Sequence, residues 1–191
     1  MATISPDLLD AAERAFVRHG YAGATVERIA AEAGVSRVTL HRRGIGRDDL
    51  LAALVERATE NYRRAVWPAL TAKGTGAERL QMALHALCEV AERHMALLLA
   101  VRSQNDRIFH GVPDDDGALT RTVFTEPLER LLRDGSADGT LRSADPTREA
   151  TVLFNLVGWT YVHLRAGHGW SSERAAQATL DPVLHGVLKD K

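Results

Sequence analysis

A group of arginines in the first quarter of the chain offers the most recognisable chemistry in this sequence. Five arginines and two acidic residues lie between Thr25 and Arg47, in a chain of 191 residues with a formal net charge of -1. Guanidinium groups suit phosphates and the edges of guanine bases. Because the whole chain has almost no net charge, contact with nucleic acid must come from this local basic segment.

Other kinds of chemistry are poorly supported. His85 and Cys88 are three residues apart, the spacing of a thiolate pair or part of a metal site on one helical face, but no third ligand follows clearly. Cys88 is the only cysteine, and a small buried core residue is the simpler interpretation. His163 and His168 are five residues apart and should not share a helical face. The chain has no glycine-rich phosphate loop, nucleophile elbow or paired carboxylates, so we expect no enzyme, no cofactor and no metal site.

The elements that must position the basic residues are helices. Apolar residues recur at helical spacing almost throughout, without alternating strand patterns, so the fold class is predicted to be all-α. A first helix should begin after Ser5 and stop at Gly20, a second should run from Thr25 to Gly34, and a third should begin at Ser36. The third should end near the glycines at 44 and 46, which makes three helices in the first 46 residues.

The second and third helices form a helix-turn-helix pattern. The turn is Ala33-Gly34-Val35-Ser36, in which glycine can take the positive φ of a tight turn. Ile29, Val35 and Leu40 are expected to be buried between the helices. With Leu40 inward, the outward face of the third helix carries Arg37, Val38, His41 and Arg42, and that face suits the DNA major groove. The alternative is an ordinary solvated face on a small helical hairpin.

The first 51 residues resemble the DNA-binding domain of the tetracycline-repressor (TetR) family of bacterial transcriptional regulators. The match needs no gap and includes Phe16, Gly20-Tyr21, Thr25, Ile29-Ala30, Ala33-Gly34-Val35-Ser36, Thr39-Leu40 and Asp48-Asp49-Leu50-Leu51. The resemblance implies that Thr25 and Thr39 contact phosphates, that Arg37, Val38 and Arg42 face bases, and that His41 and Arg47 grip the backbone. The predicted DNA-binding residues are Thr25, Arg28, Ser36, Arg37, Val38, Thr39, His41, Arg42, Arg43 and Arg47.

Three positions depart from the family pattern. The family usually has Tyr at the position of His41, an aromatic residue at Gly44 and Lys at Arg47. Arg47 keeps its charge and His41 can still donate to a phosphate, but the missing aromatic side chain removes packing against the next helix. We therefore expect a recognition helix that frays more than is usual while Arg42, Arg43 and Arg47 retain DNA affinity.

The rest of the chain is also predicted to be helical. A long helix should run from Arg47 to Trp67-Pro68, and the capping-box spacing of Thr75 and Glu78 should start another, which carries the apolar residues of 80–91. Further helices are expected over 95–102, 119–133 with a kink or restart at Pro127, 146–165, and from Ser171, with a loop over 110–117. The predicted domains are the helix-turn-helix domain, 1–46, and a helical ligand-binding and dimerisation domain, 47–191.

The family resemblance implies a homodimer joined through the last two helices and a pocket for a small molecule. Residues 153–164 are apolar nearly all round, which favours an interface, although a central core helix of a monomer is the alternative. Polar candidates for orienting a ligand are Arg102, Asn105 and His163. For the apolar candidates, plain core packing is the simpler interpretation in each case. They are Trp67, Met95, Phe109, Phe124, Phe154, Trp159 and Tyr161. Phe124 and Trp159 are retained as ligand-binding predictions.

These patterns together predict a cytoplasmic, homodimeric, ligand-responsive regulator. It would be a repressor that a hydrophobic or aromatic effector releases from a duplex DNA operator, with an anionic ligand facing Arg102 left open. No signal peptide is recognisable, and no apolar stretch reaches the roughly 20 residues of a membrane span. The alternative is a helical small-molecule-binding protein whose DNA-binding head has degenerated, as His41 and Gly44 would suggest. The sequence leaves open the operator, the effector and the choice between repressor and activator.

Overall fold

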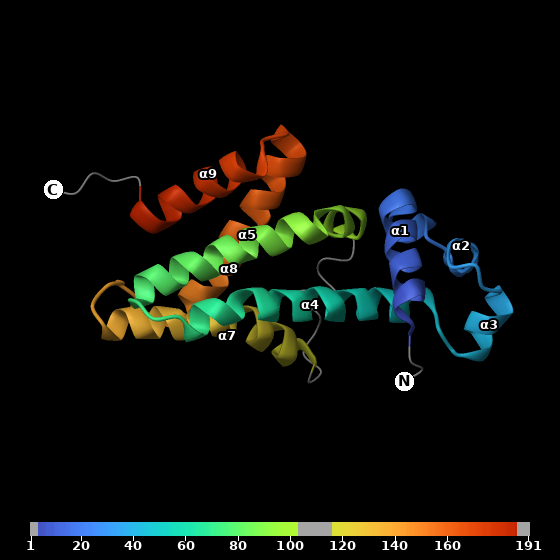
Figure 1. Cartoon of the computed structure of the whole chain (residues 1–191), viewed down its shortest axis with the longest axis horizontal. Coiled ribbons are helices and arrows are strands. Elements are labelled where there is room, and N and C mark those ends of the chain that lie inside the picture. Colours follow the sequence, from blue (N-terminus) through green and yellow to red (C-terminus); the bar gives the residue numbers. More distant parts are fainter. Residues whose placement is uncertain (1–3, 103–115, 187–191) are drawn as a thin grey trace. The chain divides into compact units, whose positions relative to one another are not determined.

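The computed structural model describes residues 4–102 and 116–186, of which 116–122 are described by their backbone alone. All regular structure in these residues is helical, which confirms the predicted fold class (Figure 1). The helices are α1 Pro6–Gly23, α2 Val26–Glu32, α3 Arg37–Arg42, α4 Arg47–Thr71, α5 Gly76–Ala100, α7 Asp116–Ala137, α8 Pro146–His168 and α9 Ser172–His185. Within the described ranges no helix is both long and apolar enough to cross a membrane.

The chain divides into two compact units. The first contains residues 1–59 and 94–117, and the second contains 60–93 and 118–191. Helices α4 and α5 each contribute residues to both. The first unit therefore includes residues from beyond the segment 1–46 that was predicted as the DNA-binding domain.

One hydrophobic core holds the first unit together. Phe16 of α1, Ile29 of α2 and Leu40 of α3 are at most 1% exposed. Leu97 of α5 and Val101, directly after that helix, join them in the core. Burying such side chains is the main stabilising contribution in a unit of this size.

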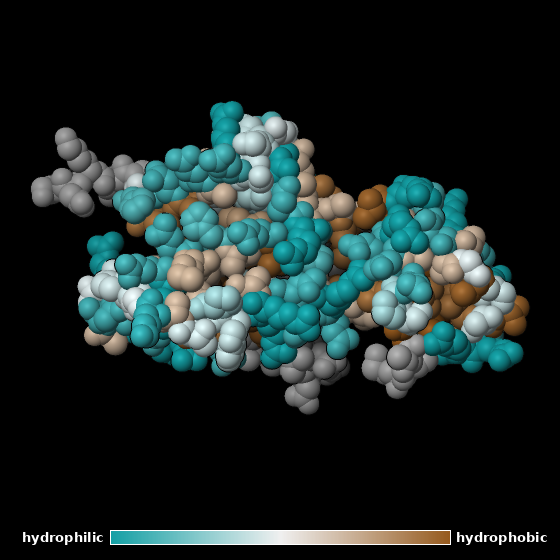
Figure 2. Space-filling model, viewed as in Figure 1, coloured by the Kyte–Doolittle hydropathy of each residue, from teal (hydrophilic) through white to brown (hydrophobic). Residues whose placement is uncertain are grey.

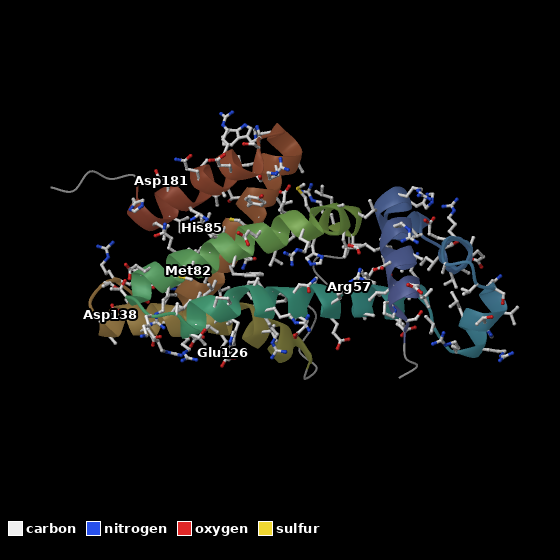
Figure 3. All side chains as sticks on the ribbon, viewed as in Figure 1. Arg57, Met82, His85, Glu126, Asp138 and Asp181 are labelled. Atoms are coloured by element: carbon white, nitrogen blue, oxygen red, sulfur yellow. The ribbon has the colours of Figure 1, made fainter. Side chains whose placement is uncertain are left out.

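Ion pairs on the surface of the first unit join its helices. Arg57 of α4 binds two carboxylates of α1, with Nη1 2.5 Å from Asp10 and Nη2 2.5 Å from Glu13 (Figure 3). Arg14 and Arg18 of α1 in turn bind Glu32 of α2 at 3.0 and 2.8 Å. Helix α1 is thus tied to both α4 and α2.

Local capping signals place the helix boundaries largely as predicted. Gly20 has a φ of +67° and interrupts α1 where the stop was expected. The Thr25 hydroxyl accepts from the Arg28 amide at 3.4 Å, and the Ser36 hydroxyl accepts from the Thr39 amide at 3.1 Å. These side chains satisfy amides that have no partner within the helix. Ser5 precedes α1 as expected, but its side chain makes no capping hydrogen bond.

After Arg47 the structure confirms the predicted capping box and corrects three other predictions. Thr75 and Glu78 exchange hydrogen bonds at 2.8 and 3.2 Å, as predicted. The two helices expected over 80–91 and 95–102 are one continuous helix, α5, because no glycine or proline interrupts the residues between them. Helix α7 continues through Pro127, so the helix does not restart there, and a kink at this residue stays a prediction. Trp67, expected in the core, is 62% exposed.

A close backbone contact joins α5 to the end of α7. A Cβ atom on Gly76 would lie 2.2 Å from the Cα atom of Gly135, so only glycine fits there. The amide of Gly76 donates to Asp138 at 2.6 Å, and Arg79 pairs with Asp134 at 2.9 Å. The loop after α7 therefore caps the first turn of α5.

Candidate nucleic-acid interface

The outer face of α3 presents the side chains that the sequence placed there. Leu40 is 1% exposed and anchors α3 to the core, whereas Arg37, Val38, His41 and Arg42 are exposed. Val38 is 65% exposed, so its side chain is available for contact with another molecule. In Figure 2, apolar surface lies beside hydrophilic surface over α2 and α3. Cationic groups next to an exposed apolar side chain can bind guanine edges and thymine methyl groups.

The turn between α2 and α3 has the predicted glycine geometry. Gly34 has a φ of +66°, and the amide of Val35 donates to the carbonyl of Ala30 at 3.0 Å. Val35 itself is 39% exposed, so the prediction that it is buried between the helices was wrong. Ile29 and Leu40 fill that space without it.

The structure explains Gly44, one of the departures that were expected to loosen the recognition helix. Gly44 has a φ of +64° and follows Arg43, the C-cap of α3. Its amide donates to His41 and the next amide, of Ile45, donates to Leu40, both at 3.0 Å. Ile45 is 5% exposed and belongs to the core. The end of α3 is therefore closed by a glycine turn and an apolar anchor.

Arg47 is held against α1. Its guanidinium carbon lies 4.2 Å from the centre of the Tyr21 ring, and its Nη1 donates to the Tyr21 carbonyl at 3.3 Å. The Tyr21 hydroxyl in turn donates to Asp48. The cation thus supports the start of α4, and its predicted contact with the DNA backbone stays a prediction.

The start of α2 is similarly organised. Arg28 donates to the Gly23 carbonyl at 2.6 Å, while Thr25 caps the helix. Across the turn, Nε of Arg37 lies 2.9 Å from Oε1 of Glu27. The pKa of Glu27 lies below its usual range because of a backbone hydrogen bond and a bond from the Thr25 hydroxyl, with a smaller effect of Arg37. From the sequence, Glu27 was counted only as one of the two acidic residues between Thr25 and Arg47. Its ion pair with Arg37, which is a predicted DNA contact, was not identified.

The remaining DNA-binding predictions lie in or beside the same helix. Ser36 and Thr39 have their hydroxyls 2.8 Å apart, and both residues are exposed. Arg43 is exposed and is the C-cap of α3. The predicted residues therefore gather on α3 and its two caps, while Thr25, Arg28 and Arg47 stand near the starts of α2 and α4.

The predicted ligand-binding residues are distributed differently. Arg102 is exposed in the first unit, and Asn105 and Phe109 lie outside the described residues. In the second unit, Phe124 packs with Tyr62 and Phe154 at ring separations of 5.3 and 5.2 Å. Trp159 is half-buried. Phe124 is therefore part of an aromatic cluster in the second unit.

His163 and Cys88 complete the chemistry-bearing residues. The rings of His163 and His168 are 5.0 Å apart, so the prediction that their spacing keeps them separate was wrong. Gly167 has no side chain to occupy the space beside the His163 ring, where a Cβ atom would lie 3.3 Å from the imidazole. Cys88 is 2% exposed, and burial raises the pKa of its thiol to about 12, as fits a core residue. In the described ranges no group of three or more His, Cys, Asp or Glu residues is placed to hold a metal.

Comparison with known proteins agrees with this geometry. Residues 8–54 match the family model of bacterial regulatory proteins of the tetR family. The fold is similar to PfmR, a TetR-family transcriptional regulator from Thermus thermophilus, with 20% identity, a TM-score of 0.77, and 95% of this chain and 99% of that chain covered.

Two further solved structures are similar. One is the fatty acid degradation regulator FadR from Bacillus halodurans, with 18% identity, a TM-score of 0.75 and coverage of 98% and 100%. The other is the transcriptional regulator FadR from Bacillus subtilis in complex with stearoyl-CoA, with 16% identity, a TM-score of 0.71 and coverage of 95% and 98%. At these identities the similarity establishes the fold.

Proposed function

By its N-terminal domain the chain is a TetR-family protein, and on that premise we propose that it is a homodimeric repressor whose operator binding is relieved by a small hydrophobic or aromatic molecule. The observation that carries the proposal is the outer face of α3. Leu40 packs in the core, so Arg37, Val38 and Arg42 lie on the exposed side of the helix. Such a face fits the major groove.

Exposed apolar residues on α8 support the dimer. Val152 is 54% exposed and Leu156 is 47% exposed, and the spacing of four residues places them on one side of the helix with half-buried Trp159. A second copy of the chain that covers the stripe of Val152, Leu156 and Trp159 would provide the second DNA-binding region that a two-fold operator requires.

The effector is proposed from chemistry and from the related proteins. The aromatic cluster of Tyr62, Phe124 and Phe154 gives the second unit an apolar interior. The Bacillus subtilis FadR structure contains stearoyl-CoA, so long-chain acyl-CoA is the first compound to test, followed by free fatty acids and aromatic compounds. Because α4 and α5 contribute to both units, a ligand that displaces either helix can alter the head. The ligand must bind the free and DNA-bound states unequally to cause release.

The first experiment is binding of the protein to duplex DNA from its own upstream intergenic region. Binding is titrated with salt and with nonspecific competitor DNA. A complex that resists competitor supports the regulator, and its affinity should fall steeply as salt rises. Weak binding without sequence preference favours the second candidate, a ligand-binding protein with a degenerate head, which the exposed His41 and Gly44 motivate.

Variants separate specific from general contacts. Arg42→Ala should reduce discrimination between operator and random DNA, whereas Arg47→Ala should weaken binding to all sequences similarly. Arg64→Ala is the matched control, because it removes the same charge from an exposed residue of the second unit. A loss of discrimination in Arg64→Ala equal to that in Arg42→Ala would contradict the assignment of the interface.

Effector release is tested on the same complex. Stearoyl-CoA, stearate and an aromatic compound are added separately to the preformed protein–DNA complex. A compound that dissociates the complex, and whose affinity for the protein is lowered by operator DNA, is an inducer because coupling between the two ligands is reciprocal. A compound that strengthens the complex would identify a co-repressor and would contradict the proposed direction of regulation.

A further inference from the structure

The recognition surface contains a carboxylate, Glu27, in a place where a negative charge opposes binding to phosphate. Glu27 belongs to α2, and its Oε1 lies 2.9 Å from Nε of Arg37 on α3. The Thr25 hydroxyl contributes to holding the pKa of Glu27 below its usual range. Arg37 and Thr25 are both predicted DNA contacts. The carboxylate therefore lies beside a residue that is predicted to face the bases.

Folding gains little from this ion pair. The side chains of Arg37 and Glu27 are 67% and 53% exposed. Exposed pairs contribute little to stability because water and salt screen the two charges. The turn already has its own determinants, since Gly34 supplies the positive φ and Leu40 the buried anchor. The effect of Glu27 must therefore be sought in what Arg37 does.

The atoms used by the pair are informative. The closest approach of the pair joins Oε1 of Glu27 to Nε of Arg37, which lies on the side of the guanidinium group. A guanidinium group binds guanine with two parallel donors directed at O6 and N7. A carboxylate beside Nε restricts rotation of the planar group, and the two Nη groups can then serve as the donors to a base. An arginine without this restraint can turn to the nearest phosphate instead.

We propose that Glu27 is a positioning residue that holds Arg37 for base recognition, so that it lowers general DNA affinity and increases discrimination at a guanine. This inference rests on the proposed DNA-binding function. It predicts that one substitution has opposite effects on general DNA affinity and on discrimination between sequences. Glu27→Gln should bind random DNA more tightly, because a negative charge is removed, and should distinguish its preferred sequence less well.

The test is selection of duplexes from a random-sequence pool by the full-length protein, followed by sequencing and by affinity measurements on the selected and scrambled duplexes. The variants are Glu27→Gln, Arg37→Ala, the double variant and Glu32→Gln. Glu32 is the matched control, because it lies on the same helix, undergoes the same charge change and binds Arg14 and Arg18 instead.

The expected result is a wild-type preference for guanine at one symmetric pair of positions that both Glu27→Gln and Arg37→Ala reduce by about fivefold or more. Glu32→Gln should retain that preference, and Glu27→Gln should have no further effect on discrimination in the Arg37→Ala background. A Glu27→Gln variant with the wild-type preference would overturn the inference while the DNA-binding function stands. A wild-type protein that selects no sequence would overturn both.

Discussion

At the level of single residues, the candidate interface depends on which arginines are engaged within the protein. Arg47 stacks on Tyr21, Arg28 binds a backbone carbonyl and Arg37 pairs with Glu27. The partner of Arg47 is 26 residues away in the sequence. A count of positive charges cannot distinguish an arginine that stabilises the first unit from one that is presented to DNA.

Arg47→Ala should destabilise the first unit. The variant removes the contact with the Tyr21 ring and the hydrogen bond to its carbonyl, and we expect a loss of about 1 kcal/mol. Urea denaturation followed by circular dichroism measures the change. Arg42→Ala, at an exposed position of α3, serves as the comparison and should stay within about 0.5 kcal/mol of the wild type. Equal stability of the two variants would show that the Tyr21 contact contributes nothing.

Gly44→Ala should also be destabilising. No atom lies within 4 Å of an added Cβ, so the effect would come from the φ of +64° and not from a clash. A left-handed conformation disfavours alanine by about 1 kcal/mol, and asparagine adopts it more readily. The midpoint temperature of thermal unfolding should therefore be highest with glycine at position 44, lower with asparagine and lowest with alanine. An alanine variant as stable as the wild type would be inconsistent with this turn geometry.

At the level of elements, helix boundaries follow from local capping while helix continuity does not. Thr25, Ser36 and the Thr75–Glu78 pair act as the sequence predicted. By contrast, α5 is one uninterrupted helix whose residues 76–93 belong to the second unit and 94–100 to the first, with buried side chains in each part. A fading apolar pattern near residue 92 could not indicate that support.

The predicted fraying of α3 can be measured directly. The helix has only six residues and one buried side chain, Leu40, so few contacts oppose local opening. Hydrogen exchange of the amides from Thr39 to Arg43 should be faster than that of α1 amides around Phe16. Strong protection of these amides would refute the prediction and would show that the Ser36 cap and the Gly44 turn suffice to hold the helix.

The contact between α5 and α8 should give a pH-dependent stability. Glu92 accepts from Nε and Nη2 of Arg165 at 2.8 and 2.5 Å and from the Tyr161 hydroxyl at 2.8 Å. The Arg165 hydrogen bond holds the pKa of Glu92 below its ordinary value of 4.5, against an opposing effect of burial. A lowered folded-state pKa stabilises the protein above pH 4.5, and that contribution disappears as the pH falls through the folded-state pKa.

Glu92→Gln should therefore destabilise the protein by about 2 kcal/mol at pH 7, and the difference from wild type should narrow as the pH falls below 4.5. Urea midpoints measured from about pH 7 down to about pH 3 test this. Glu60→Gln, which affects only an exposed pair with Arg64 and a longer one with Arg63, should have little effect at any pH. A difference in the free energy of unfolding between Glu92→Gln and wild type that does not change with pH would argue against the ion pair.

At the level of the whole molecule, the proposed activity requires two copies of the chain. The exposed stripe on α8 is the surface that a second copy would cover, and Trp67 and Met82 show that other large apolar side chains are exposed as well. Exposure alone therefore does not identify the interface. The spacing of Val152 and Leu156 along one helix makes α8 the better candidate.

Leu156→Glu should convert the proposed dimer into monomers. A charge in the centre of a covered apolar stripe would be buried without a partner, which disfavours association by several kcal/mol. Sedimentation equilibrium measures the dissociation constant. Met82→Glu is the matched control, because Met82 is 45% exposed on α5 (Figure 3), and it should leave association unchanged. A Leu156→Glu variant that remains dimeric would place the interface elsewhere.

The all-α class, the helix-turn-helix and most helix starts could be predicted from the amino-acid sequence, because these features depend on side chains within a few residues of one another. Ser36 can cap α3 and Gly34 can turn the chain whatever the rest of the protein does. The folded chain was needed to show that Val35 and Trp67 are exposed, that His163 meets His168, and that Glu27 binds Arg37. These outcomes depend on how helices pack and where they end, and a linear pattern does not contain that information.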